Sequence, residues 1–214
     1  MIQRYLKKKR RRQLKLQKDT LSLHIHILMR VKMPVLIIVC GYVGSGKSTV
    51  ARELSRLTGF EVISSDVVRK MLAGIPVSEH RYEDFSRGIY SPVYTEKTYS
   101  RLIEEGKKRL KEGKSVILDA TFSKKWQRRA AREAALGEGA KFLCVETVCP
   151  DDIIKKRLIN RVRKGESVSD GRWEIFQRHK ESFENIDEFS PDEYVIVKTD
   201  SKLKYELDKI MERI

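Results

Sequence analysis

The stretch that decides the fold is Gly41-Tyr42-Val43-Gly44-Ser45-Gly46-Lys47-Ser48, which fits the pattern G-x-x-x-x-G-K-[ST] at every position. The preceding residues 35–40 are continuously apolar and rich in β-branched side chains, which is typical of a buried parallel strand. The following residues 49–57 have helix-forming composition and carry apolar residues at helical spacing. The order of strand, glycine-rich loop and helix predicts a phosphate-binding P-loop at residues 41–48.

The chemistry expected of this P-loop follows from its backbone and from two side chains. Backbone N–H groups around residues 44–48 would surround a phosphate, and the helix N-terminus would add a partial positive charge. Lys47 is expected to act catalytically by reaching the β- and γ-phosphates, and the Ser48 hydroxyl is expected to ligate Mg²⁺. The sequence therefore predicts that ATP and Mg²⁺ are bound, with nucleotide contacts from Gly41, Gly44, Ser45, Gly46, Lys47, Ser48 and Thr49.

The composition fits a single domain with a sizeable core, since the chain has 214 residues of which 40% are hydrophobic. The formal net charge of +15 is unevenly placed: residues 1–33 hold 11 Lys and Arg against one acid, and the remainder holds 34 against 29. The charge of the domain is therefore weak evidence for a polyanionic substrate. Three cysteines without metal-ligand spacing favour a reducing cytoplasm. No stretch approaches the roughly 18 apolar residues of a membrane span, so no membrane is expected as a partner.

Residues 1–33 form a basic extension with more than one interpretation. The six consecutive basic residues at positions 7–12 suit an arm for nucleic acid or anionic surfaces. The alternatives are a disordered tail, or an artefact of an upstream start whose true start is Met33. A signal peptide is disfavoured because His24 and His26 interrupt the apolar part. We therefore divide the chain into this extension and a domain at residues 34–214.

Strand-like and helix-like segments alternate along the domain. We expect strands at residues 35–40, 60–65, 115–119, 141–147 and 193–198. We expect helices at residues 49–57, 66–72, 95–112, 124–136, 172–185 and 202–213, and one more that begins at Pro150. Asp66 is expected at the N-cap of its helix and Pro150 at the first helical position, while residues 74–92 are expected to be an inserted loop with short helical pieces. The alternation predicts an α/β fold, in which helices cover both faces of a parallel sheet.

The candidate chemistry lies just after the strands, because ligands of such sheets bind outside the carboxyl ends of the strands. Asp66 follows the second strand as a candidate general base, and Arg69, one turn on, is a candidate to bind an anionic group of the substrate. Asp119 closes the third strand, where it could hold Mg²⁺ through water beside the substrate. Arg157 and Arg161 lie one turn apart on a helix and could fold over the γ-phosphate as catalytic residues of a mobile lid.

Each of these residues also has a purely structural interpretation. Asp66 could serve only as a helix cap, Arg69 as a solvated helix residue and Asp119 as the last residue of its strand. The arginine pair carries the least weight alone, because the chain is rich in arginine. The set as a whole is much less expected by chance than any single member.

Three stretches together resemble a known family: Gly44-Ser45-Gly46-Lys47-Ser48-Thr49, Ser64-Ser65-Asp66-Val67-Val68-Arg69-Lys70 and Val116-Ile117-Leu118-Asp119-Ala120-Thr121-Phe122. Over roughly residues 34–200 the chain resembles the P-loop kinases of the "AAA domain, ATPase family" type and the kinase half of bacteriophage polynucleotide kinase. More distantly it resembles zeta toxins and chloramphenicol phosphotransferase. The resemblance implies a three-layer P-loop NTPase fold with a five-stranded parallel sheet in the order 2-3-1-4-5 and an arginine-bearing lid.

The same resemblance implies roles for individual residues. It assigns Asp66 as the base and Arg69 as the clamp for a substrate anion, and it assigns either Arg157 or Arg161 as the lid arginine. Residues 74–94, where the substrate would bind, match nothing in the family. The identity of the phosphoryl acceptor therefore stays open.

Three functions follow from these observations. The first is an ATP-dependent kinase that phosphorylates a hydroxyl of a small molecule. The second is a polynucleotide or nucleoside 5′-hydroxyl kinase. Bases of its substrate could stack on Tyr82, Phe85 or Tyr90, although aromatic side chains in an inserted segment more often form a small core of their own. The third is a nucleotide-controlled switch or ATPase. A GTPase is disfavoured because the sequence has no Asn-Lys-x-Asp motif. A mechanochemical AAA+ machine is disfavoured because the expected strands and helices of the domain leave no residues for its additional helical domain.

Overall fold

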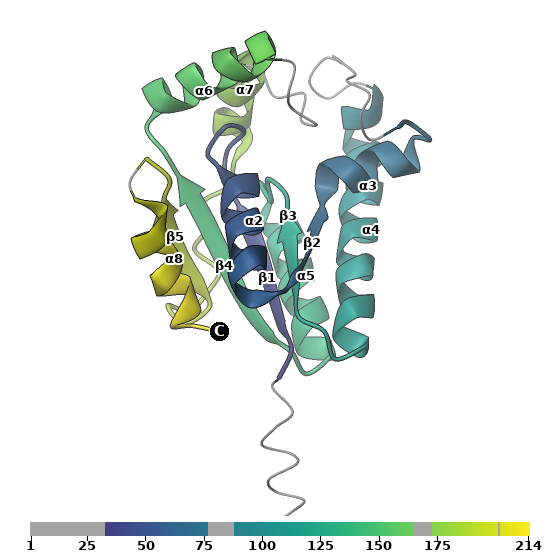
Figure 1. The fold of residues 1–214 in the computed structure, drawn as a ribbon. Coiled ribbons are helices and arrows are strands. Elements are labelled where there is room, and N and C mark those ends of the chain that lie inside the picture. The colour runs from purple at the N-terminus through teal and green to yellow at the C-terminus, as the bar shows by residue number, and fades with distance from the viewer. Residues whose placement is uncertain (1–32, 77–87, 165–172, 201) are drawn as a thin grey trace, which may run out of the picture. The chain divides into compact units, whose positions relative to one another are not determined.

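The computed structural model describes residues 33–76, 88–164, 173–200 and 202–214. Within these residues, five parallel strands form one sheet in the order β2-β3-β1-β4-β5 (Figure 1). The strands are β1 (Val35–Cys40), β2 (Glu61–Ser64), β3 (Val116–Asp119), β4 (Lys141–Val148) and β5 (Tyr194–Lys198). This arrangement confirms the predicted α/β fold, including the strand order 2-3-1-4-5.

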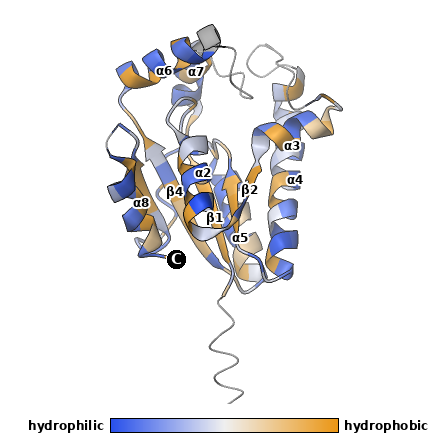
Figure 2. Cartoon of the chain, viewed as in Figure 1, coloured by the Kyte–Doolittle hydropathy of each residue, from blue (hydrophilic) through white to orange (hydrophobic). Residues whose placement is uncertain are grey.

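Helices cover both faces of the sheet, as the alternation of segments predicts. One face packs against α2 (Lys47–Thr58) and α8 (Leu203–Met211), and the other packs against α4 (Pro92–Lys111) and α5 (Lys125–Gly137). Alternate residues of β1 belong to two separate buried clusters, one with each pair of helices. All six residues of β1 are buried, because a central strand of a covered parallel sheet has no face toward water. Figure 2 shows the same contrast, with hydrophobic β1 beside helices that carry both kinds of residue.

A third buried cluster lies at the carboxyl ends of the strands. The helices α6 (Asp151–Lys164) and α7 (Trp173–Ser182) contribute Ile154, Leu158 and Phe176, which pack on Val43 of the P-loop. The ring of Tyr42 meets that of Phe176 edge to face, with centroids 5.7 Å apart. We call α6 and α7 the lid. In Figure 1 the lid lies near the N-terminal end of α2, at the edge of the sheet toward which the strands point.

The roles expected of Asp66 and Pro150 at the starts of their helices are wrong, as the hydrogen bonds show. The helix α3 (Ser65–Leu72) is capped by Ser64, whose hydroxyl accepts the amide of Asp66 at 3.3 Å, so Asp66 is not the N-cap. The carbonyl of Pro150 accepts the amide of Ile154 at 3.0 Å, which places Pro150 just before the first residue of α6 rather than within it.

Two further helices differ from expectation in length. The helix α4 begins at Pro92 rather than at residue 95, because Ser91 caps it through the amide of Tyr94. The helix α7 ends at Ser182 rather than near residue 185, because the chain after it forms a hydrogen bond with the loop that follows β3. There the amide of Glu184 donates to the carbonyl of Ser123 at 2.9 Å.

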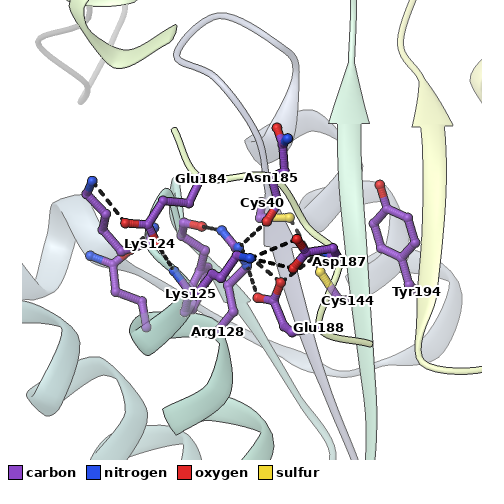
Figure 3. A network of polar contacts seen from close by, with 12 residues as sticks. Cys40, Lys124, Lys125, Arg128, Cys144, Glu184, Asn185, Asp187, Glu188 and Tyr194 are labelled. Atoms are coloured by element: carbon purple, nitrogen blue, oxygen red, sulfur yellow. Dashed lines mark hydrogen bonds and ion pairs between the residues drawn. The ribbon is translucent and has the colours of Figure 1, made fainter. Parts of the chain in front are cut away.

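A buried arginine fixes the segment that follows the lid. Arg128 of α5 forms an ion pair with Glu188, at 2.6 Å between Nε and Oε1, and both side chains are almost fully buried. The same guanidinium donates to the carbonyls of Phe122 at 2.9 Å and of Asn185 at 3.0 Å (Figure 3). Because Phe122 follows β3, one side chain ties the loop after β3 to the chain that leaves the lid.

Several expectations fall outside the described residues. These are the basic extension at residues 1–32, the aromatics Tyr82 and Phe85 of the inserted segment, and most of the polar segment between α6 and α7. A short 3₁₀ helix, η1 (Gly88–Tyr90), precedes α4. Among the described residues, no helix is both long enough and apolar enough to cross a membrane.

Candidate nucleotide and acceptor site

The backbone conformation of the P-loop requires glycine at three positions of the motif. Gly41, Gly44 and Gly46 all have positive φ, at 131°, 79° and 98°, a conformation that other residues rarely adopt. At Gly41 space is lacking as well, since a Cβ there would lie 2.5 Å from the carbonyl oxygen of Thr147. Glycine at position 41 therefore allows the chain that leaves β1 to lie directly against Thr147 of β4.

We expect Gly41→Ala to destabilise the P-loop and to lower affinity for the ATP analogue AMPPNP by more than about tenfold. Both the positive φ and the contact with the Thr147 carbonyl would force the backbone to shift. The matched control is Gly59→Ala, which has a φ of 75° at the end of α2 but no atom within 4 Å of the new methyl group. Calorimetric titration should show near-normal affinity for the Gly59 variant, and equal losses in the two variants would contradict this account.

Two threonines that the sequence analysis missed hold the P-loop in place. The Oγ1 atom of Thr147 lies 2.5 Å from the Ser45 hydroxyl and donates to the carbonyl of Cys40 at 3.0 Å. The Oγ1 atom of Thr199 donates to the carbonyl of Ser45 at 2.7 Å. A signal was present in the sequence, because both threonines lie at the carboxyl ends of strands, where ligand sites of such sheets form. The Ser45 side chain is fully buried against Thr147 and does not line the cavity described below.

The side chains expected to face the phosphates and the metal ion lie together. The Nζ atom of Lys47 donates to the carbonyl of Tyr42 at 2.8 Å, and burial lowers the pKa of Lys47 although Asp119 and Asp66 oppose the shift. Asp119 is 7% exposed, and burial raises its pKa against the opposing effects of Lys47 and of a hydrogen bond from Ser48. A hydroxyl and a carboxylate that line one cavity are hard oxygen donors, so this pair fits Mg²⁺, which keeps few protein ligands and completes its shell with phosphate and water.

One cavity, of about 420 Å³, joins the P-loop to the ends of β2 and β3. The sheet register explains why, because Ser64 of β2 and Val39 of β1 both lie opposite Asp119 of β3. The cavity is lined by eight of the twelve predicted site residues, namely Gly44, Gly46, Lys47, Ser48, Asp66, Arg69, Asp119 and Arg161. The other four do not line it: Gly41, Ser45, Thr49 and Arg157.

Arg69 lies on the acceptor side of this cavity in an unusual environment for an arginine. It is 7% exposed, and its NH1 atom donates to the carbonyl of Ile89 at 2.5 Å and to the hydroxyl of Thr95 at 3.3 Å. Its guanidinium lies 4.9 Å from the centre of the Tyr90 ring. The guanidinium also lines the cavity, where a charged donor of this kind could contact a ligand.

The structure separates the two arginines of α6. Arg161 lines the cavity, where burial and then Arg157 lower its pKa while Asp119 and Asp66 oppose the shift. Arg157 instead donates from NH1 to the Thr199 hydroxyl at 2.9 Å and from NH2 to the Thr199 carbonyl at 2.6 Å. Of the two, only Arg161 lines the cavity.

The lid adds a histidine that the sequence did not single out. His179 of α7 lines the cavity, and burial, followed by the charges of Lys47 and Arg69, lowers its pKa to about 4. It is therefore neutral at pH 7. The sequence carried no signal for it, because only the folding of the lid over the P-loop brings α7 to the cavity.

The parallel sheet and the glycine-rich loop after its central strand define a P-loop NTPase fold. Residues 36–186 match the family described as "AAA domain". The chain belongs to this family. A relative in Mycobacterium tuberculosis, named only as an uncharacterized protein, is 33% identical over 129 residues, which are 59% of this chain and 25% of the relative. The chain thus spans about a quarter of the length of the curated relatives that it matches first.

Solved structures share the fold at low sequence identity. A sugar kinase from Janibacter superposes with a TM-score of 0.60 at 20% identity, over 84% of this chain and 93% of that one. The APS kinase of Mycobacterium tuberculosis, in complex with AMPPNP and APS, gives a TM-score of 0.59 at 19% identity, over 85% and 97% of the two chains. These similarities establish a common fold.

Proposed function

We propose that the protein is an ATP-dependent kinase that transfers the γ-phosphoryl group to a hydroxyl of a small molecule. The observation that carries this proposal is a single cavity whose lining includes Lys47 and Ser48 of the P-loop on one side and Asp66 and Arg69 of α3 on the other. A cavity shared by phosphate-binding residues and the carboxylate of Asp66 suits transfer between two bound substrates. A nucleotide-binding switch would not need the second set.

On the donor side, charge neutralisation and positioning are the main requirements of phosphoryl transfer. Lys47 and Arg161 are cations that line the cavity, and we assign Lys47 to the β- and γ-phosphates and Arg161 to the γ-phosphate. Ser48 and Asp119 would hold Mg²⁺, which when bound would neutralise charge on the β- and γ-phosphate oxygens. Both side chains line the cavity beside Lys47.

On the acceptor side, Asp66 is the residue that we assign as general base. It lies in the first turn of α3, faces the cavity, and is joined electrostatically to Lys47 and Arg161 across it. A carboxylate in this position would accept the proton of the acceptor hydroxyl and hold its oxygen toward the γ-phosphate. Arg69 lines the same cavity and would bind an anionic group elsewhere on the acceptor.

A second candidate is a 5′-hydroxyl kinase for nucleosides or polynucleotides, as the likeness to phage polynucleotide kinase suggests. The favouring observation is that Tyr90 and Trp126 line the acceptor side, and that Trp126 is 45% exposed. Exposed aromatic rings can stack on bases. Arg69 would then meet a phosphate of the nucleic acid.

The acceptor is identified by incubating the protein with ATP and Mg²⁺ against 5′-hydroxyl oligonucleotides, nucleosides, sugars and antibiotics, with and without anionic groups. Mass spectrometry would detect the phosphorylated product. A phosphorylated anionic small molecule supports the first candidate, and a phosphorylated oligonucleotide supports the second. Release of inorganic phosphate with no phosphorylated acceptor would favour an ATPase or switch and count against both.

The donor half is tested separately with Lys47→Ala. Loss of charge-assisted hydrogen bonds to the phosphates is expected to weaken AMPPNP binding by about 10- to 150-fold in calorimetric titration. Lys114→Ala is the matched control, since Lys114 is exposed at the far end of the domain and pairs with Glu112. Wild-type affinity in the Lys47 variant would overturn the assignment of the P-loop as the nucleotide site.

A further inference from the structure

A chain of hydrogen bonds runs from the lid to the P-loop without entering the cavity. Arg157 of α6 donates to both the hydroxyl and the carbonyl of Thr199, the first residue after β5. The Thr199 hydroxyl in turn donates to the carbonyl of Ser45 at 2.7 Å. The amide of Thr199 donates to the carbonyl of Val148 at 3.0 Å, so the residue is also fixed to the end of β4. Thr199 therefore stands between the lid and the P-loop.

Thr199 also packs closely against the P-loop at Gly46. A Cβ at Gly46 would lie 3.1 Å from both Cβ and Cγ2 of Thr199, so Thr199 covers the turn that leads into α2. The Thr199 hydroxyl accepts from a charged group and donates to a carbonyl, and each bond of such a chain strengthens the next. A planar guanidinium suits this arrangement, because its two terminal nitrogens reach the hydroxyl and the carbonyl at once.

We propose that Arg157 is a positioning residue that holds the P-loop in its phosphate-binding shape through Thr199, and that it thereby couples the lid to nucleotide binding. Arg157 then acts on the loop that surrounds the α- and β-phosphates, whereas Arg161 of the same helix faces the γ-phosphate position. This inference concerns nucleotide binding alone. It holds or fails independently of whether a phosphoryl group is transferred.

The proposal predicts a specific pattern of nucleotide affinities. Because the P-loop binds the phosphates that ADP and ATP share, loss of Arg157 should weaken ADP and AMPPNP equally. Loss of Arg161, which acts on the γ-phosphate, should weaken AMPPNP alone. Loss of the Thr199 hydroxyl should reproduce the effect of losing Arg157, since the two residues act in one chain.

The experiment is a double-mutant cycle with Arg157→Ala, Thr199→Val and the pair, titrated calorimetrically with ADP and with AMPPNP in the presence of Mg²⁺. Each single variant is expected to weaken both nucleotides by about tenfold, and the double variant by little more than either single one. Thr199→Ser keeps the hydroxyl and should retain affinity. Arg161→Ala is the control, and its effect on AMPPNP should add to that of Thr199→Val.

Three outcomes would overturn the proposal. One is an Arg157 variant that binds ADP normally and AMPPNP weakly, since Arg157 would then contact the γ-phosphate. Another is full additivity of Arg157→Ala and Thr199→Val, which would mean that the two residues act separately. The third is normal binding of both nucleotides by a folded Thr199→Val variant. Circular dichroism of each variant checks the fold, and Arg157→Lys replaces Arg157→Ala in the cycle if the alanine variant does not fold.

Discussion

Asp66→Asn is expected to lower the turnover number for phosphoryl transfer by about 10²- to 10⁴-fold, which is the usual contribution of a general base. The amide would preserve the shape of the side chain but could not take up the proton of the acceptor hydroxyl. AMPPNP affinity should change little, because Asp66 lies on α3 and not on the P-loop. Steady-state rates with the acceptor found in the screen, together with calorimetric titration of AMPPNP, measure the two effects separately.

The matched control for this prediction is Asp152→Asn. Asp152 is an exposed carboxylate on α6 that pairs with Lys156 and does not line the cavity. Its loss should leave both rate and affinity near the wild-type values. If Asp66→Asn turned over a confirmed acceptor at the wild-type rate, Asp66 would have no part in the proton transfer.

Glu188→Ala is expected to lower the free energy of unfolding by about 3–5 kcal/mol, because it leaves the Arg128 guanidinium buried without its carboxylate. Arg128 has no exposed side-chain surface and Glu188 only 3%, so water cannot replace the lost partner without opening the structure. A domain of this size should lose about 6–20 °C in Tm. Urea denaturation and thermal melting of the variant provide the measurement.

An exposed ion pair in the same network provides the control. Lys125 and Asp187 lie 2.6 Å apart next to the buried pair, but the Asp187 side chain is 62% exposed (Figure 3). Solvent screening limits the contribution of such pairs, so Asp187→Ala should cost less than about 1 kcal/mol. Similar losses for the Glu188 and Asp187 variants would show that burial does not govern the strength of this network.

The parts of the fold that local patterns determine were predictable. The strand β1 begins and ends where the apolar run does, and the P-loop follows it at the expected residues. The strand order followed from a family resemblance and is confirmed by the sheet. The ends of helices were less predictable, because a single hydrogen bond decides them. Ser64 rather than Asp66 caps α3, although both residue types are good caps.

The parts of the site that depend on long-range contacts were not predictable. Thr147, near the end of β4, and Thr199, just after β5, meet the P-loop from more than 100 positions away in sequence. His179 reaches the cavity only because the lid packs on Val43, and that contact involves apolar residues that look like any others in a helix. The sequence placed Arg157 and Arg161 on one helix face, but only the fold shows that one faces the cavity and the other meets Thr199.

The central claim is that the P-loop and Asp66 serve one phosphoryl-transfer site, and the fate of the γ-phosphate tests it most directly. The measurement is the partition of label from γ-labelled ATP between acceptor and inorganic phosphate, for the wild-type protein and for the Asp66→Asn variant, with Mg²⁺ and the acceptor screen. We expect the wild type to place label in an acceptor and the variant to lose that transfer while it still binds nucleotide. Label found only in inorganic phosphate, in equal amounts for both proteins, would contradict the claim.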